Sequence, residues 1–171
     1  EWNRRQRQMC IRDREKGVDP LPNHHDGPPD LATDATYPFL FGNFRILQHE
    51  HSSTFNDYGL MKNYGTNKLW INKMDAHDLQ IEEGDLVRLK SPWGEIDIEA
   101  HPTWDIMPGI LGSAGGFGHK RGLEGDPKFP QFGGKNPPGI QKPNITEDMG
   151  GTPLLKYIKT RVEKIEQPAL S

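Results

Sequence analysis

The sequence predicts a mainly β, loop-rich domain, and three observations lead to this prediction. Glycine (19 of 171 residues) and proline (15) are abundant, while apolar residues make up only 33% of the chain, below the roughly 45–50%, counted with glycine, that is usual. Few segments have the period of an amphipathic helix. Several short apolar or alternating runs are instead bounded by turn residues, which is typical of strands.

Composition and charge exclude several functional classes. The 21 Lys and Arg residues against 24 Asp and Glu give a net charge of −3, which argues against a general nucleic-acid binder. No window holds the ~20 apolar residues that a membrane span needs. The single cysteine, Cys10, excludes an internal disulfide and a thiolate-only zinc site, and it cannot alone hold an iron–sulfur cluster.

The N-terminal part reads as a polar extension. Residues 1–16 are rich in arginine and fit the last turns of a polar helix, which Gly17 and Pro20 would stop. Residues 18–36 contain four prolines and have no apolar period, as in a linker. We therefore expect residues 1–36 to be a helix end and linker, and residues 37–171 to be the barrel domain described below.

The first elements of the compact domain can be placed in order. An apolar run at 38–41 predicts a buried strand that ends in a turn at Gly42 and Asn43, with residues 44–47 as a candidate extension. A polar loop follows. The next strand is expected at 69–71, and Asn72 or Asp75 can cap a short helix after it.

The later elements include a hairpin. Residues 86–90 and 95–100 alternate between apolar and polar side chains and are joined by a tight turn at 92–94. Another strand is expected at 110–111, running into the glycine-rich segment 112–118, and a last one within 154–165. Between them, residues 119–143 predict a long loop, a length that is often functional.

One stretch between Leu69 and Gly109 resembles the C-terminal molybdopterin-dinucleotide-binding domain of the dimethyl sulfoxide reductase family. The family pattern is roughly hydrophobic-N-x-x-D-A, then L-G-I-x-x-G-D-x-V-x-V-x-S-x-x-G, then I-x-P-G. This chain has Asn72, Asp75 and Ala76 in the first part, and Gln80 where the family usually has glycine. The resemblance covers roughly residues 37–165 and implies a six-stranded double-psi β-barrel.

A second stretch, residues 45–54, resembles the cofactor loop of that family, roughly G-R-x-x-x-H-x-H-[ST]-x-[ST]. Here Phe44 precedes the arginine instead of glycine. Residues 144–148 and 115–119 resemble two further family elements, and Lys156 stands where several members place a basic contact. The resemblance therefore implies these cofactor-binding residues, with no catalytic residue and no metal ligand among them: Gly42, Asn43, Arg45, His49, His51, Ser52, Ser53, Thr54, Gly116, Asn144 and Lys156.

The chemistry of these residues suits an anionic ligand. A pyrophosphate carries about two negative charges, and a domain of net charge −3 must attract it with local donors rather than a bulk field. Arg45 offers a fork of N–H groups, Lys156 a point charge, and the residues at 52–54 short hydroxyls. Glycines at 42 and 112–118 would let a flat ring approach the backbone.

Other interpretations of the same residues stay open. His49 and His51 lie two apart and could share a metal ion with a third ligand, or they could be structural. A double-psi barrel that serves as a binding or adaptor module without cofactor would scatter Arg45, His49, Ser52 and Lys156 over its surface. Two groups favour structural roles: the tryptophans Trp70 and Trp93 in packing, and the carboxylates Glu82, Glu83 and Asp85 in a turn.

The resemblance implies the cofactor-binding domain, or an equivalent separate subunit, of a molybdenum or tungsten oxidoreductase with a bis(pyranopterin guanine dinucleotide) centre. Such a chain would not be catalytic alone. Expected partners are the remaining domains or subunits, with an iron–sulfur electron-transfer subunit among the candidates, and neither nucleic acid nor a membrane span. For the substrate the sequence leans to a sulfur or other chalcogen oxyanion. Cytoplasmic and exported locations both stay open. Because the first residue is Glu1, we expect a processed chain or part of a longer one.

Overall fold

A computed structural model describes most of the expected domain and the N-terminal helix. The described residues are 2–17, 32–54, 57–118, 134–141, 153 and 156–166. Asn144, most of the expected 119–143 loop and most of the expected linker lie outside them. The strands run from Phe39 to Lys164, within the range expected for the barrel domain, whose boundary stays a prediction.

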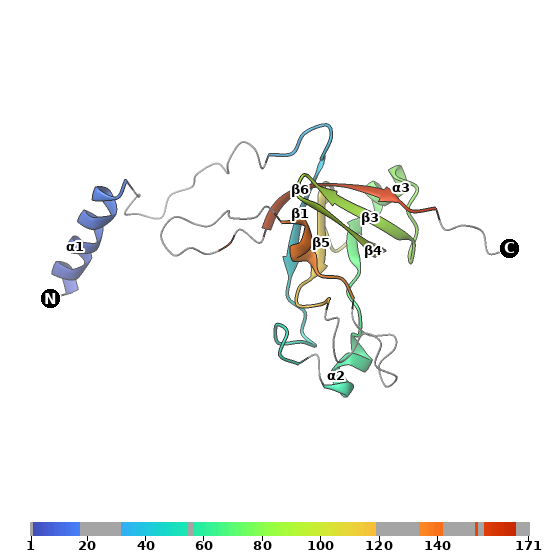
Figure 1. Cartoon of the computed structure of the whole chain (residues 1–171), viewed down its shortest axis with the longest axis horizontal. Coiled ribbons are helices and arrows are strands. Elements are labelled where there is room, and N and C mark those ends of the chain that lie inside the picture. Colours follow the sequence, from blue (N-terminus) through green and yellow to red (C-terminus); the bar gives the residue numbers. More distant parts are fainter. Residues whose placement is uncertain are drawn as a thin grey trace.

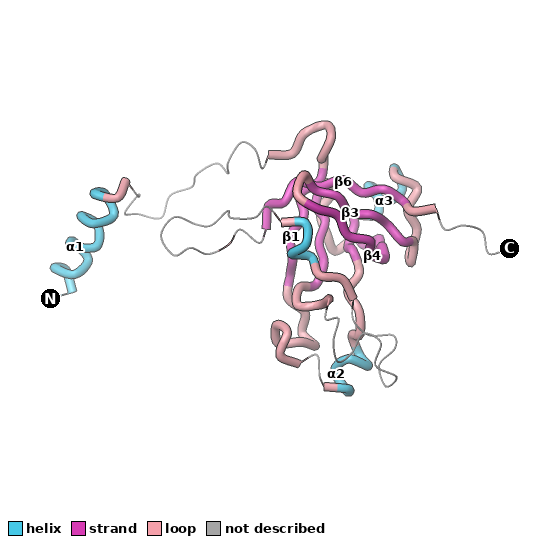
Figure 2. The backbone as a smooth tube through the Cα atoms, viewed as in Figure 1, coloured by secondary structure: helices cyan, strands magenta, loops and turns pink. Residues whose placement is uncertain are grey.

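Six strands and a few short helices make up the described fold (Figure 1, Figure 2). Among the described residues, none of the helices has the length and hydrophobicity of a membrane-spanning segment. The elements are α1 (Trp2–Glu15), β1 (Phe39–Phe44), α2 (Tyr58–Asn63), β2 (Leu69–Asn72), α3 (Lys73–Asp78), β3 (Leu86–Ser91), β4 (Gly94–Thr103), β5 (Ile110–Ala114), the 3₁₀ helix η2 (Pro137–Ile140) and β6 (Lys156–Lys164).

The strands close into a barrel in the order β1-β5-β2-β4-β3-β6. The pairs β1/β5 and β2/β4 are parallel, and the other neighbours are antiparallel. Closure leaves no sheet edge exposed, so a small β domain can be stable with few helices. The predicted mainly β, six-stranded double-psi barrel is confirmed.

The barrel interior is filled by the inward side of the alternating strands. Val87 and Leu89 of β3 are fully buried, as are Leu69 and Ile71 of β2, so the period of two read from the sequence sets which face is inside. Ile140 of η2 joins this core, and its carbonyl accepts a 2.6 Å hydrogen bond from Ser91 Oγ. The 3₁₀ helix therefore extends the barrel core.

The N-x-x-D-A motif is structural in this chain. The Asn72 side chain accepts a hydrogen bond from the Met74 N–H as the N-cap of α3 and donates to the Ile106 carbonyl. Asp75 Oδ2 accepts a 2.7 Å hydrogen bond from the Gly109 N–H, and Ala76 is buried in the core. The three residues thus fasten α3 to the turn before β5.

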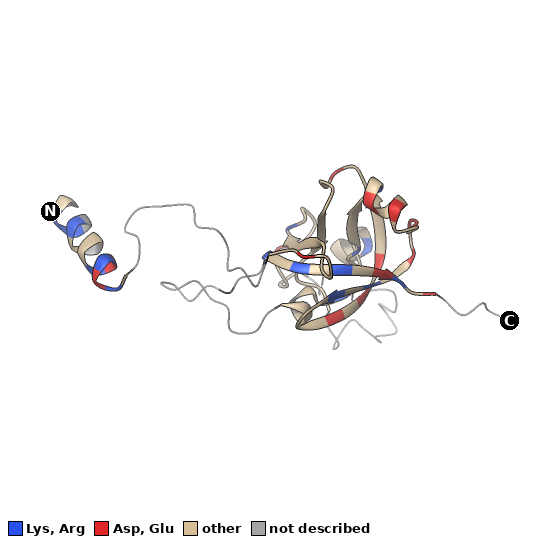
Figure 3. Ribbon diagram, turned by 90° about the horizontal axis from the view of Figure 1, so that it is seen from above, with Lys and Arg blue, Asp and Glu red and all other residues tan. Residues whose placement is uncertain are grey.

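Two of the turn carboxylates, Glu83 and Asp85, are held by neighbouring side chains, whereas the sequence led us to expect turn carboxylates that face water. Asp85 Oδ2 accepts hydrogen bonds from the Glu82 N–H and from Lys164 Nζ, and the lysine bond lowers the pKa of Asp85. Glu83 contacts Lys68 and His101. Figure 3 shows acidic and basic residues interspersed along the strands.

Several elements differ from the sequence expectation. The turn expected at Gly42 and Asn43 is wrong, because both residues lie within strand β1 and pair with β5. Helices α2, of six residues, and η2, of four, were not expected. Strand β5 extends to Ala114 instead of ending at residue 111. The expectation that Gly112 lets a ligand approach is wrong, since a Cβ there would lie 3.0 Å from the Phe44 ring. That glycine makes room for a side chain of the protein itself.

Candidate functional site

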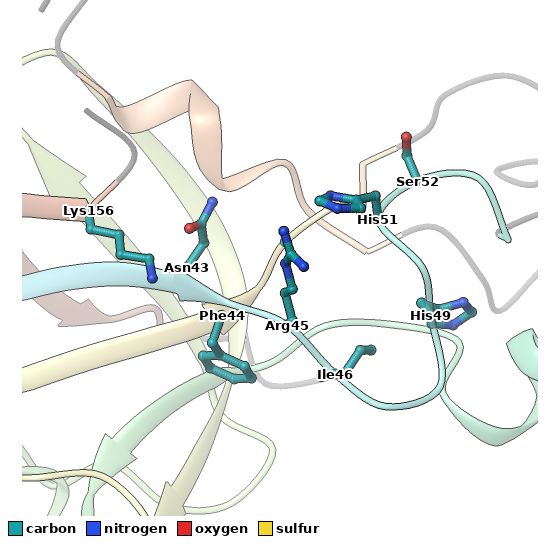
Figure 4. A pocket seen from close by; sticks show the side chains of 10 residues that line it. Asn43, Phe44, Arg45, Ile46, His49, His51, Ser52 and Lys156 are labelled. Atoms are coloured by element: carbon teal, nitrogen blue, oxygen red, sulfur yellow. The ribbon is translucent and has the colours of Figure 1, made fainter. Parts of the chain in front are cut away.

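A cavity of about 430 Å³ lies at the end of the barrel where β1 and β5 finish and β6 begins. Strand β1 and the loop after it form one side, the glycines after β5 another, and the first residue of β6 closes it (Figure 4). We call this cavity the β1-end pocket. Its lining residues are Asn43, Phe44, Arg45, Ile46, His49, His51, Ser52, Gly115, Gly116 and Lys156.

Seven of the eleven predicted cofactor-binding residues line the β1-end pocket: Asn43, Arg45, His49, His51, Ser52, Gly116 and Lys156. Arg45, His49, Ser52 and Lys156 therefore share one hollow, and the scatter expected for an adaptor barrel is not found. The predicted residues Gly42, Ser53 and Thr54 are described but do not line the pocket, and Asn144 lies outside the described residues.

The three described residues that do not line the pocket have other contacts. A Cβ built on Gly42 would lie 3.8 Å from the Lys156 Cβ and Cγ atoms, so this glycine lies beside the lysine stem. Ser53 Oγ donates a 2.6 Å hydrogen bond to the Glu50 carbonyl, and Thr54 Oγ1 accepts one from the Glu50 N–H. Both hydroxyls are thus engaged in the fold of the loop.

His49 is held at both ring nitrogens. Its Nε2 lies 2.8 Å from the Tyr64 carbonyl oxygen, which can only accept, so Nε2 carries the proton. In the neutral ring Nδ1 then accepts from the Thr54 hydroxyl at 3.0 Å. The side chain is 7% exposed. His49 therefore fastens the loop to the end of α2.

An apolar cluster packs against the loop that follows β1. Met61, Ala114 and Phe117 form a small second core, against which Phe44, Ile46 and Tyr64 pack. The Phe117 ring meets the His49 ring edge-on, with centroids 5.8 Å apart. Burial raises the pKa of the Tyr64 hydroxyl. The cluster packs against two pocket-lining residues, Phe44 and Ile46, and so helps to order the loop that carries the polar side chains.

The charges of the β1-end pocket differ from those of the barrel wall. On the wall, cations have carboxylate partners: Arg88 binds Asp97 through two hydrogen bonds of 2.6 and 2.9 Å, and Lys90 lies 2.8 Å from Glu163. Within the described residues, no carboxylate pairs with Arg45 or Lys156, the two cations of the pocket, and no carboxylate lines it. The pocket therefore presents donors and positive charge without internal neutralisation.

A metal site at the histidines has no support in the described part of the chain. No group of three or more His, Cys, Asp or Glu side chains converges there. Both nitrogens of His49 are already in hydrogen bonds, while His51 lies 3.7 Å from Glu50, and both of these side chains are largely exposed. His49 and His51 thus do not share a third ligand among these residues.

Sequence reasoning missed Phe44 and Ile46 as lining residues, whereas Gly115 lies in the glycine-rich segment that the sequence had singled out. Ile46 packs against the second core, whereas the neighbouring apolar residue Leu47 is fully exposed, so the sequence alone does not tell which of the two is buried. Asn67 was also missed. Its buried amide donates to Ser113 Oγ and to the carbonyls of Ala114 and Lys135, and its oxygen accepts from the Lys135 N–H. Its position two residues before a strand gives no local sign of these distant partners.

Comparison with known proteins places this chain in a family. The family model described as "Molydopterin dinucleotide binding domain" matches residues 39–140. In structure the chain is similar to acetylene hydratase from Pelobacter acetylenicus, with a TM-score of 0.71 and 18% identity over 90% of this chain and 22% of that one. At that identity, the structural likeness shows the fold alone.

Curated relatives are much longer than this chain. Dimethyl sulfoxide reductase DmsA of Escherichia coli is 32% identical over 96 residues, which cover 55% of this chain and 12% of the relative. The F420-dependent formate dehydrogenase subunit alpha of Methanocaldococcus jannaschii is 38% identical over 80 residues (46% and 12%). The nitrate reductase of Symbiobacterium thermophilum is 39% identical over 87 residues (50% and 11%). The aligned part spans about an eighth of the length of these relatives.

The matched range, 39–140, holds five of the six barrel strands and every lining residue except Lys156. Since the family model covers more than half of the chain, the protein belongs to the molybdopterin-dinucleotide-binding domains of the dimethyl sulfoxide reductase family of molybdenum and tungsten oxidoreductases.

Proposed function

We propose that this chain clamps the pyrophosphate-bearing part of a molybdopterin guanine dinucleotide in the β1-end pocket. One observation carries the proposal: Arg45 and Lys156 meet in one cavity without a carboxylate partner among the described residues. A site that stays empty would hold two like charges in one cavity without a described carboxylate to compensate them. A bound anion supplies that compensation.

The donor set fits this ligand. Arg45 offers a planar fork suited to phosphate oxygens, and Lys156 a compact ammonium group. The Asn43 amide, the Ser52 hydroxyl and the backbone at Gly115 and Gly116 line the same hollow. Each hydrogen bond to a charged group contributes about 1.5–3 kcal/mol. Three such bonds would therefore outweigh the ordering of a few side chains, at about 1–2 kcal/mol each.

The residues then divide into two roles. Direct polar contacts come from six of the seven predicted residues that line the pocket, while the seventh, His49, lines it but uses both ring nitrogens to hold the loop. Gly42, Ser53 and Thr54 act on the shape of the walls. Asn144 stays a predicted contact. When bound, the cofactor supplies a molybdenum or tungsten centre for two-electron chemistry, and this chain binds and orients the dinucleotide.

The remaining domains or subunits of the enzyme supply the metal ligand, the substrate channel and the electron path. An iron–sulfur electron-transfer subunit is a candidate partner on the same reasoning. The names of the relatives include dimethyl sulfoxide reductase, formate dehydrogenase and nitrate reductase. Since these names cover different substrates, we infer that specificity resides outside this domain. The lean towards a sulfur or chalcogen oxyanion stays a prediction.

The experiment uses the complete enzyme that contains this chain, or that assembles with it. We would purify the wild type, the Arg45→Met/Lys156→Met variant and the control Lys62→Met, an exposed lysine outside the pocket. Guanine nucleotide released by acid treatment reports the cofactor content. We expect at least a tenfold loss in the pocket variant and none in the control. Full cofactor content in the pocket variant would contradict the proposal.

A further inference from the structure

Strand β6 contains an irregularity beside the β1-end pocket. Its pairing with β1 is regular from Phe39 to Phe41, where Phe41 lies opposite Ile158. The next pair joins Gly42 to Lys156, so Tyr157 is left out of the register. One extra residue on one strand is a β-bulge.

The bulge changes the side of the sheet on which Lys156 lies. Ile158, Thr160 and Val162 are buried and lie two residues apart, so they form the inward row of β6. In a regular strand Lys156 would continue that row into the barrel core. It is instead exposed, lies beside Gly42 and lines the pocket. A shift of one residue exchanges the two faces of a strand.

The backbone of Tyr157 adopts an unfavourable conformation at this bulge. Its φ is +71°, in the left-handed region that bulky side chains rarely adopt and that bulges of this kind usually fill with glycine. The Tyr157 side chain is 63% exposed, so burial of its ring does not explain the strained conformation. The observed consequence of the bulge is the placement of Lys156.

We propose that Tyr157 is a positioning residue whose left-handed backbone inserts the bulge that turns Lys156 out of the inward row of β6 and into the dinucleotide pocket. This rests on the proposed function, because Lys156 is the residue through which Tyr157 acts. The Tyr157 ring itself is not required. A residue that readily adopts the left-handed conformation should keep Lys156 in the pocket. A residue for which this conformation is unfavourable should remove the bulge and move the Lys156 ammonium group out of the pocket.

Guanosine diphosphate is a suitable probe, because it carries a guanosine and a pyrophosphate group. Its dissociation constant for the full chain is measured from amide shifts in an NMR titration of the wild type, Tyr157→Gly, Tyr157→Val and Lys156→Met. Glycine adopts a positive φ readily, whereas β-branched valine does not. We expect Tyr157→Gly to bind within about twofold of the wild type. Tyr157→Val should bind as weakly as Lys156→Met, about ten- to a hundredfold below it.

A double variant separates positioning from a general structural effect. If Tyr157 acts through Lys156, Tyr157→Val/Lys156→Met binds no more weakly than either single variant. Additive losses would overturn the proposal, and so would wild-type affinity in a folded Tyr157→Val or a loss in Tyr157→Gly as large as that in Lys156→Met. A nuclear Overhauser contact between Gly42 and Lys156 should persist in Tyr157→Gly and disappear in Tyr157→Val.

A deletion covers the case in which Tyr157→Val does not fold. Removing Tyr157 leaves a regular ladder that again places Lys156 opposite Gly42, so the deletion variant should keep wild-type affinity. Loss of binding in that variant would count against the proposal. If guanosine diphosphate shifts no pocket amide in the wild type, the proposed function itself fails and this inference fails with it. Wild-type binding with unchanged variants overturns the inference alone.

Discussion

His49 donates a 2.8 Å hydrogen bond from Nε2 to the backbone carbonyl of Tyr64, the residue that caps the end of α2. The contact joins positions fifteen residues apart and fixes the loop that carries Arg45 and His51. His49, the first histidine of the H-x-H motif, therefore stabilises the conformation of the loop. The other, His51, has a φ of +49° and a largely exposed side chain in the pocket lining.

The first prediction separates these two histidines. His49→Ala leaves the Tyr64 carbonyl and the Thr54 hydroxyl without their partner in a buried site, and this costs about 1–3 kcal/mol of unfolding free energy. His51→Ala, at an exposed position, should change stability by less than about 0.5 kcal/mol. Urea denaturation gives both values, and hydrogen exchange at Tyr64 and its neighbours should rise only in His49→Ala. Equal stability of the two variants would contradict this assignment.

The second prediction concerns the end of α3. The Ile81 N–H binds the Ala76 carbonyl and the Gln80 N–H binds the His77 carbonyl, the pattern of a Schellman motif, in which the residue of positive φ is usually glycine. Here that residue is Gln80, with φ +54°. Gln80→Gly should stabilise the protein by about 0.5–1 kcal/mol, since glycine relieves the backbone strain.

Thermal unfolding tests this effect against Gln80→Ala. The alanine control removes the side chain but keeps the Cβ, so its melting temperature should stay close to that of the wild type. A lower melting temperature for Gln80→Gly would show that the glutamine is preferred at this position. The departure from the family pattern at Gln80 is thus a local strain that the barrel tolerates.

Much of the barrel follows from sequence because its strands are local patterns. The alternation at 86–90 and 95–100 predicted the β3–β4 hairpin. Asn72, one of two candidate caps in the sequence, is the N-cap of α3. The helices α2 and η2 could not be predicted in this way, because segments of six and four residues are too short to show an apolar period. The position of η2 depends on a contact made far along the chain, the bond between Ser91 and the Ile140 carbonyl.

In the site, too, the sequence predicts what depends on local patterns and misses what depends on distant contacts. The motif from Arg45 to Thr54 drew attention to the right loop, but it does not distinguish His49, which fastens the loop, from its neighbours in the pocket. That difference depends on Tyr64, fifteen residues away. The face on which Lys156 lies depends on a bulge at Tyr157, and tyrosine carries no sequence signal for a left-handed backbone.

The third prediction is a pH dependence of stability. The hydrogen bonds from Arg88 hold the pKa of Asp97 below its ordinary value of 3.8. A lowered pKa means that the carboxylate stabilises the folded state above the unfolded pKa, and that this contribution is lost as pH falls through the folded pKa. Both side chains are more than one third exposed, so solvent screening limits the effect to about 1 kcal/mol or less.

The variant Asp97→Asn tests the sign. At pH 7 it should unfold at a lower urea concentration than the wild type, and the difference should shrink once the pH falls well below 3.8, the ordinary pKa of this carboxyl. Glu95→Gln is a matched control, because Glu95 lies 4.0 Å from Arg88, at the limit of an ion pair. A difference that grows towards acid pH would contradict the prediction.

The fourth prediction concerns Asn67, which is 2% exposed and binds Lys135 through both the amide and the carbonyl oxygen of its side chain. Asn67→Ala should lower the unfolding free energy by about 2–3 kcal/mol, because several buried groups lose a partner. Asn63→Ala, at an exposed position of α2, is the matched control. Hydrogen exchange at Lys135 should rise in the first variant, and equal exchange in the two variants would argue against this role.

The central claim is that the β1-end pocket binds the anionic part of a guanine dinucleotide. The most direct measurement is an amide shift map of the full chain titrated with guanosine diphosphate. The account predicts that the largest shifts fall on Asn43, Arg45, Ser52, Gly116 and Lys156, and that they vanish in Arg45→Met/Lys156→Met. Shifts confined to another face of the barrel, or identical shifts in that variant, would contradict it.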